Sequence, residues 1–213
     1  MGKCIIIAPL YAGEHQDYLQ TEAGDLLICA DGGYDAAVQH GLKPGLVIGD
    51  FDSMPADHVQ KCEVITLPVH KDDTDMVVCL EEGRRRGYTS FRIAGCLGGR
   101  LDHTISNLQC LYDCALRGED AWMCDAQNLV SVMLPGSYAL PRMEEYKFSL
   151  LSYTPEVKGV TLRGTEWELE DAALTNRYPL GVSNEIHAPF AELSFAEGAL
   201  LVLYSKDMSF VTK

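Results

Sequence analysis

The feature that most constrains the fold is a change in hydrophobic period near residue 135. Before this point, short apolar runs alternate with longer amphipathic stretches, which is the pattern of parallel strands joined by helices. After Pro135, segments with a period of two take over, such as 191–195, and these are typical of antiparallel strands. The sequence therefore predicts an α/β domain over residues 1–133 and an all-β domain over residues 134–213.

Six short apolar runs are expected to form the parallel sheet, and because they are apolar on both faces, helices should cover the sheet on two sides. These runs are 3–8, 25–30, 46–48, 64–67, 90–94 and 121–124. Apolar residues at helical spacing predict three helices, at 34–40, 74–86 and 102–116. In the second domain the expected strands are 146–153, 160–163, 191–195 and 200–204, with a hairpin connection at 196–198.

The charge balance excludes one class of partner. The chain has 17 basic and 31 acidic residues, which gives a formal charge of −14 and an isoelectric point near 4.7. A surplus of this size repels a polyphosphate backbone but attracts cations and cationic small molecules. We therefore expect no nucleic-acid partner.

Apolar runs and cysteines indicate the compartment. No apolar run reaches the ~18 residues that a membrane span requires, and the opening run is too short for a signal peptide. The eight cysteines contain no C-x-x-C pair, which argues against structural zinc. Reduced thiols in the cytoplasm, with no membrane partner, are the expected state.

Aspartates follow four consecutive predicted strands. They occur in the strings ADGG (30–33), GDFDS (49–53), KDDTD (71–75) and GGRLDH (98–103). Open α/β sheets place their ligands at the carboxyl ends of the strands, so these side chains should meet at one edge of the sheet. Taken singly, each aspartate is more often a turn former or helix cap, and His103 alone is more often structural. Four such clusters in succession favour a functional site.

Converging carboxylates need a counter-charge. In extended chain the carboxylates of Asp50 and Asp52 stand roughly 6–7 Å apart, and their repulsion is about 2.5 kcal/mol at an effective dielectric near 20. A Mg²⁺ ion removes this conflict because it binds a few carboxylates and keeps other positions for water and phosphate oxygens. Lys71, Arg100 and Arg92 would then contact phosphate.

Several familiar phosphate and hydrolase motifs are missing from the sequence. It contains no G-x-x-x-x-G-K-[ST], no G-x-G-x-x-G, no H-E-x-x-H and no G-x-S-x-G, so the corresponding mechanisms do not apply. Metal-assisted phosphate chemistry remains as the expected activity.

The order of the acidic clusters resembles the thiamine pyrophosphokinase family. The resemblance rests on ADGGYDAAVQHGLKPGLVIGDFDS, KDDTD and GGRLDHTISNL, and continues with GTEWEL at 164–169 and GVSNE at 181–185. It implies an α/β nucleotide-binding domain followed by an antiparallel β-sandwich, usually as a homodimer with thiamine held at the subunit interface. It also implies transfer of pyrophosphate from ATP to thiamine, with Mg²⁺ as the required ion.

The resemblance implies roles for individual residues. Asp50, Asp52 and Asp75 are similar to the carboxylates that bind Mg²⁺ and position the pyrophosphate, and Asp31 with Gly32 would lie near the triphosphate. Thr74 and Arg100 resemble phosphate contacts, and Asp102 resembles the carboxylate near the thiamine hydroxyl, which makes it the candidate base or orienting group. A phosphate role for Lys71 is inferred from its charge alone. Ser183 and Asn184 would read the aminopyrimidine, and Trp167 would lie beside the thiamine rings.

Two alternatives remain open from the residues. The same carboxylates and metal could activate water, as in a metal-dependent phosphohydrolase of a nucleotide. The chain could also be a catalytically silent binder of thiamine or nucleotide, although every carboxylate of the motifs is present. Trp167 and the Ser183-Asn184 pair also fit a buried aromatic and a plain turn.

Overall fold

The computed structural model describes all residues except 1, 16–17, 51–58, 60–61, 69–71 and 208–213. The chain divides into two compact units, residues 1–126 and 127–213. The change in hydrophobic period predicts the boundary at residue 133. The structure places it earlier because strand β7 (Asn128–Met133) pairs with β14 (Leu200–Ser205) along its whole length.

The first unit is built on a parallel sheet, as the alternating pattern predicts. Its strands pair in the order β6-β5-β1-β2-β3-β4, and each neighbouring pair within this unit is parallel. The strands are β1 (Cys4–Ile7), β2 (Leu26–Ala30), β3 (Leu46–Gly49), β4 (Glu63–Thr66), β5 (Ser90–Ala94) and β6 (Asp120–Cys124). Every residue of β1 and β3 is buried, whereas β4 at the edge is mostly exposed.

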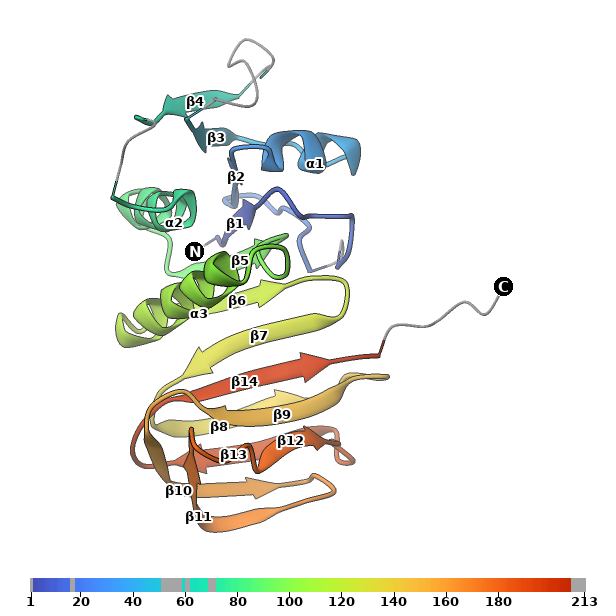
Figure 1. The fold of residues 1–213 in the computed structure, drawn as a ribbon. Coiled ribbons are helices and arrows are strands. Elements are labelled where there is room, and N and C mark those ends of the chain that lie inside the picture. The colour runs from blue at the N-terminus through green and yellow to red at the C-terminus, as the bar shows by residue number, and fades with distance from the viewer. Residues whose placement is uncertain (1, 16–17, 51–58, 60–61, 69–71, 208–213) are drawn as a thin grey trace. The chain divides into compact units, whose positions relative to one another are not determined.

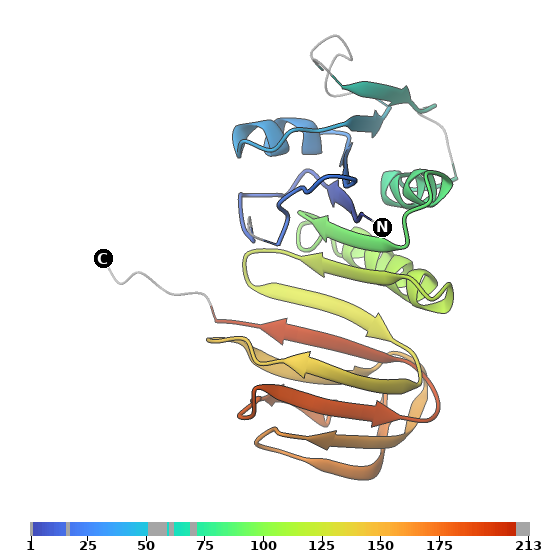
Figure 2. The same ribbon diagram turned by 180° about the vertical axis from the view of Figure 1, so that it is seen from behind.

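Helices cover both faces of this sheet. They are α1 (Gly33–Gln39), α2 (Asp75–Arg85) and α3 (Leu101–Leu116). In Figure 1, α1 and α2 lie on opposite sides of β2, which both contact. Figure 2 shows the opposite view, with β5 and β6 in front of α3. The first residue of α1 must be glycine, because a Cβ on Gly33 would lie 2.1 Å from the Ile7 carbonyl oxygen.

An ion-pair cluster around the buried side chain of Glu82 stabilises the end of α2. Glu82 accepts hydrogen bonds from the guanidinium groups of Arg85, at 2.7 Å, and Arg86, at 2.6 Å, and its side chain is buried. These hydrogen bonds, with that from Arg85 contributing most, lower the pKa of Glu82 to about 2 from its usual 4.5. The ionised form of Glu82 is therefore favoured in the folded state.

Replacing Glu82 with glutamine is expected to destabilise the protein in a pH-dependent way. Since the folded-state pKa is depressed, the stabilisation is present above about pH 4.5 and is lost as the pH falls toward about 2. Near pH 7 the substitution should lower the free energy of unfolding by about 1 kcal/mol, because water screens the exposed Arg85. Urea unfolding near pH 7 and near pH 2 measures this difference.

The neighbouring Glu81 offers a control for this substitution. Its partner Arg84 lies at 2.7 Å, but the Glu81 side chain is exposed. Glu81→Gln should therefore change stability by less than about 0.5 kcal/mol. An equal effect of Glu82→Gln at both pH values would contradict the assigned role of its charge.

The second unit is an antiparallel β-sandwich. One group of strands pairs in the order β12-β9-β14-β7 and the other in the order β11-β10-β13-β8. The remaining strands are β8 (Gly136–Pro141), β9 (Lys147–Ser152), β10 (Glu156–Arg163), β11 (Leu169–Thr175), β12 (Gly181–Asn184) and β13 (Phe190–Phe195). Tyr204 on β14 contacts Phe148 and donates its hydroxyl proton to the Pro141 carbonyl oxygen on β8, at 2.9 Å, which links the two groups.

These observations confirm the predicted fold class and show which elements the pattern missed. Four strands, β7, β8, β11 and β12, are absent from the sequence prediction. β11 and β12 lie at sheet edges and bury only one residue each, so they lack a clear apolar alternation. Among the described residues, no helix is long and apolar enough to cross a membrane.

Candidate functional site

A cavity of about 440 Å³ opens in the first unit at the carboxyl ends of its strands. Five residues predicted from the acidic clusters line it: Asp31, Asp50, Thr74, Asp75 and Arg100. The remaining lining comes from the end of β2, from the turns after β1 and β5, and from the first part of α2 and α3. The strand-end clusters, which are far apart in sequence, thus face one space.

Asp31 is held in a strained backbone conformation at the end of β2. Its φ is +44°, in the left-handed region that non-glycine residues rarely adopt. The Asp31 N–H donates to the Ile48 carbonyl oxygen at 2.8 Å, and the Asp31 carbonyl oxygen accepts from the Tyr34 N–H. A Cβ on Gly49 would lie 3.0 Å from Asp31 Oδ1, so glycine at this position makes room for the carboxylate. Strain of this kind collects at functional sites.

The start of α2 supplies two more lining groups. Thr74 is the N-cap, and its Oγ1 accepts from the Val77 N–H at 3.4 Å. Asp75 follows in the first turn. Unpaired N–H groups at a helix N-terminus favour the binding of phosphate. A carboxylate beside these groups can bind the metal ion that accompanies the phosphate. This end of the cavity can therefore receive a metal–phosphate group.

Arg100 and Asp102 form an exposed ion pair at the start of α3. Arg100 donates to both carboxylate oxygens of Asp102, at 2.6 and 3.1 Å. This pairing, together with the His103 N–H, lowers the pKa of Asp102 below its ordinary value. Asp102 is therefore ionised at neutral pH. It does not itself line the cavity, but its partner Arg100 does.

Two polar side chains in the lining, those of His103 and Asn107, have no role in the sequence prediction. His103 lines the cavity in the first turn of α3, and its place directly after Asp102 is the signal that could have identified it. Asn107 is buried and donates to the Cys96 carbonyl oxygen at 2.7 Å, which ties the turn after β5 to α3. By contrast, Arg92 does not line the cavity; it pairs with Asp120 at 2.6 Å.

The donor set is compatible with Mg²⁺. Within the described part of the chain, no three carboxylate, thiol or imidazole groups converge as a complete metal site. However, Asp50 and Asp75 line the same cavity, and Mg²⁺ is commonly bound by one or two carboxylates with water and substrate phosphates. Asp52 and Lys71 lie outside the described residues. Gly32 does not line the cavity, but a Cβ added to it would lie 3.8 Å from Pro9, which does.

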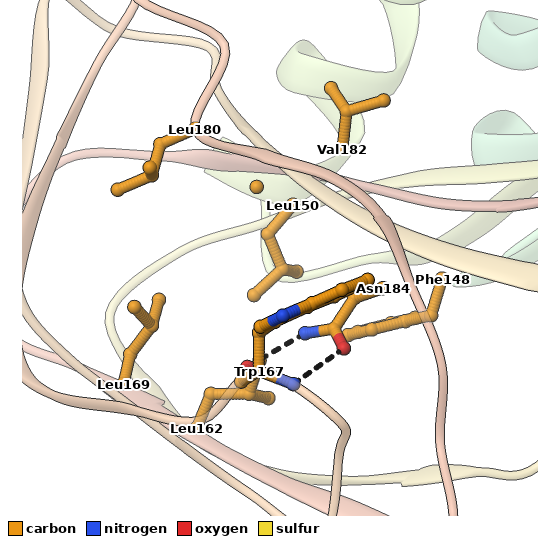
Figure 3. Close-up of a pocket in the computed structure, with 9 residues that line it drawn as sticks. Phe148, Leu150, Leu162, Trp167, Leu169, Leu180, Val182 and Asn184 are labelled. Carbon is orange, nitrogen blue, oxygen red and sulfur yellow. Dashed lines mark hydrogen bonds between the residues drawn. The ribbon is translucent and has the colours of Figure 1, made fainter.

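A second cavity, of about 340 Å³, lies within the second unit. Its lining is apolar apart from the Asn184 side chain and the indole N–H, and Figure 3 shows most of the lining side chains around Trp167. The lining residues are Phe148, Leu150, Leu162, Trp167, Leu169, Leu180, Gly181, Val182 and Asn184. Trp167 is 60% exposed, so much of its surface is accessible to a ligand.

Asn184 and Ser183 differ sharply in their surroundings. Asn184 is 6% exposed, and its side chain bonds the backbone of Trp167. Ser183 is exposed, has a positive φ of 62°, and does not line the cavity. Its N–H donates to Ser149 Oγ at 3.0 Å. Of the three residues predicted for this site, Trp167 and Asn184 line the cavity and Ser183 does not.

Two models of one protein family match this chain. The family model described as "Thiamin pyrophosphokinase, catalytic domain" matches residues 18–123, and the one for its vitamin B1 binding domain matches residues 138–200. The thiamine pyrophosphokinase of Bacillus subtilis is 28% identical over 193 residues, covering 88% of this chain and 90% of that protein.

Solved structures extend the likeness to the whole fold. The crystal structure of the B. subtilis thiamine pyrophosphokinase aligns with a TM-score of 0.87 at 26% identity, over 97% of this chain and 100% of that one. A thiamin pyrophosphokinase family protein from Enterococcus faecalis aligns with a TM-score of 0.80 at 30% identity, over 96% and 99% of the two chains.

The fold, the two cavities and these likenesses define an enzyme of the transferase class, with a parallel α/β part followed by an antiparallel β part. Within that class, the chain belongs to the thiamine pyrophosphokinase family.

Proposed function

We propose that this enzyme transfers a pyrophosphoryl group from ATP to the hydroxyl of thiamine, giving thiamine diphosphate and AMP. The observation that carries the proposal is the single cavity at the carboxyl ends of the strands, which Asp31, Asp50, Thr74, Asp75 and Arg100 line together. Family membership supports the choice of substrates. The presence of both matching parts disfavours a phosphohydrolase, which would not need a thiamine-binding part.

At the β-phosphorus of ATP, the reaction forms one P–O bond and breaks another. The thiamine hydroxyl oxygen attacks the β-phosphorus of ATP, the bond from that phosphorus to the oxygen bridging to the α-phosphorus breaks, and AMP leaves with the bridging oxygen. Asp102 is proposed to accept the hydroxyl proton as charge develops. Its lowered pKa keeps it ionised for this role. Arg100 is proposed to stabilise negative charge on the transferred phosphate oxygens.

The remaining residues of the first cavity are proposed to bind ATP and the metal. Asp50, Asp52 and Asp75 would hold Mg²⁺, which neutralises phosphate charge and polarises the β-phosphorus when bound. Asp31, Gly32, Lys71 and Thr74 would position the triphosphate. Of these, the backbone strain at Asp31 and the helix N-terminus at Thr74 give structural support.

The apolar cavity of the second unit is proposed to bind thiamine. Thiamine carries a fixed positive charge, and the exposed face of Trp167 can attract it through a cation–π interaction. Ser183 and Asn184 are proposed to lie beside the aminopyrimidine. The apolar side chains around Trp167 match the carbon edges of the rings.

The proposal also covers the oligomeric state of the enzyme and its cellular compartment. We propose a homodimer with thiamine bound at the subunit interface, which sedimentation of the purified protein would test. A cytoplasmic location is proposed because all eight cysteines are free thiols, as expected in a reducing compartment.

Product analysis tests the proposed reaction. The protein is incubated with ATP, Mg²⁺ and thiamine, and nucleotides and thiamine esters are separated by chromatography. We expect AMP and thiamine diphosphate in equal amounts, and neither when thiamine is omitted or the metal is chelated. Phosphate or pyrophosphate released without thiamine would indicate the phosphohydrolase instead. Binding of either ligand with no product at all would indicate the silent binder.

A further inference from the structure

The backbone of Trp167 is held by a side chain of β12, in addition to that of Thr165, whose Oγ1 donates to the Trp167 carbonyl oxygen at 3.0 Å. The Trp167 N–H donates to Asn184 Oδ1 at 3.0 Å, and Asn184 Nδ2 donates to the Trp167 carbonyl oxygen at 2.8 Å. Both bonds are drawn in Figure 3. The Glu185 N–H also donates to Asn184 Oδ1, at 2.8 Å. The two backbone N–H groups require an oxygen at this place, which sets the orientation of the amide.

An irregularity in β12 turns Asn184 toward Trp167. Gly181 pairs with Leu150 and Asn184 pairs with Phe148, so three steps along β12 match two along β9. One extra residue in a strand is a β-bulge, and bulges re-aim side chains beside functional sites. Here the bulge leaves Asn184 buried and its neighbour Ser183 exposed.

The hydrogen bonds of Asn184 leave little capacity for a ligand. An asparagine side chain has an oxygen with two lone pairs and an amide nitrogen with two N–H groups. The oxygen already accepts from Trp167 and Glu185, and one N–H is given to the Trp167 carbonyl oxygen. By contrast, the indole of Trp167 is largely exposed. Most of the hydrogen-bonding capacity of the Asn184 side chain is thus used by backbone groups. The Trp167 ring, in contrast, lines the cavity.

We infer that Asn184 is a positioning residue, which acts on thiamine by fixing Trp167 and not by contacting the ligand. This inference rests on the proposed function for its ligand, and it changes the role that the resemblance implies for Asn184. The aromatic face would be held ready before binding, so that the ligand does not have to order it.

A double-mutant cycle tests the inference. Asn184→Ala is expected to raise the KM for thiamine about tenfold with kcat changed less than about twofold, because a binding surface is lost and not a reacting group. In the Trp167→Ala background the same substitution should change the KM by less than about twofold, because the indole ring that Asn184 positions through the backbone is absent there. A further tenfold rise in that background would show direct ligand contact and overturn the inference.

Other variants keep the test decisive where Asn184→Ala folds poorly. Asn184→Asp keeps the acceptor for both N–H groups but loses the donor to the Trp167 carbonyl oxygen, so its KM should lie between those of wild type and Asn184→Ala. Asn128→Ala is the matched control: Asn128 Oδ1 accepts from Ser205 Oγ at 2.8 Å in the same unit but does not line this cavity. Its KM for thiamine should equal that of wild type.

A readout without turnover separates this inference from the proposed function. In a Trp122→Phe protein, Trp167 is the only tryptophan, so its fluorescence anisotropy reports the mobility of this ring. We expect lower anisotropy in Asn184→Ala and Asn184→Asp than in Asn128→Ala. Equal anisotropy in all three would overturn the inference even if the enzyme makes thiamine diphosphate. Failure of the proposed function would instead appear as absent product in wild type, with the anisotropy differences unchanged.

Discussion

Replacing Asp75 with asparagine is expected to lower kcat by about 10³-fold while the protein stays folded. Asp75 lines the cavity from the first turn of α2, where its charge is proposed to hold the metal against the phosphates. Asparagine keeps the shape but removes the negative charge that Mg²⁺ requires. Steady-state rates with saturating ATP and thiamine measure the loss, and circular dichroism checks the fold.

The neighbouring Asp72 provides the control for this variant. It is exposed, lies three residues before Asp75, and does not line the cavity. Asp72→Asn removes the same charge from the same segment, so it should leave kcat within about twofold of wild type. If Asp75→Asn behaves in the same way, its carboxylate has no part in the reaction.

The second large effect concerns Gly95, at the end of β5. Its φ is +71°, and a Cβ at this position would lie 2.2 Å from the Tyr11 backbone nitrogen and 2.6 Å from the Ala8 carbonyl oxygen. Both obstacles are backbone atoms, which cannot move aside as a side chain can. Gly95→Ala is therefore expected to reduce the free energy of unfolding by more than about 3 kcal/mol, as measured by urea denaturation.

Gly118→Ala is a control that separates the effect of the steric clash from the effect of the positive φ. Its φ is +72°, but nothing lies within 4 Å of an added Cβ. Gly118→Ala should therefore cost only the left-handed conformation, about 1–2 kcal/mol. Equal losses in the two variants would mean that the close approach of the turns after β1 and β5 contributes little to stability.

Much of the fold follows from local patterns in the sequence. The runs around Ile6, Ile28 and Ile48 are apolar throughout because they are buried on both faces, and this distinguishes parallel strands from exposed ones. β11 and β12 escaped prediction because their burial depends on neighbours that the local sequence does not specify. In β12, the bulge before Asn184 also breaks the period of two.

The candidate site was predictable to the extent that it depends on topology. Carboxyl ends of parallel strands lie at one edge of a sheet, so Asp31, Asp50 and Asp75 could be grouped without coordinates. The tie between Asn184 and Trp167 could not, because it depends on a side chain meeting a backbone 17 residues away across an irregular strand. The pairing of Arg100 with Asp102 depends likewise on side-chain orientation.

The central claim is that the strand-end carboxylates hold Mg²⁺ and, through it, the phosphates of ATP. Calorimetric titration with a non-hydrolysable ATP analogue tests this claim without turnover. We predict binding to the wild-type protein in the presence of Mg²⁺, and binding weakened by at least about tenfold when the metal is chelated or Asp75 is replaced by asparagine. Equal affinity in all three titrations would contradict the account.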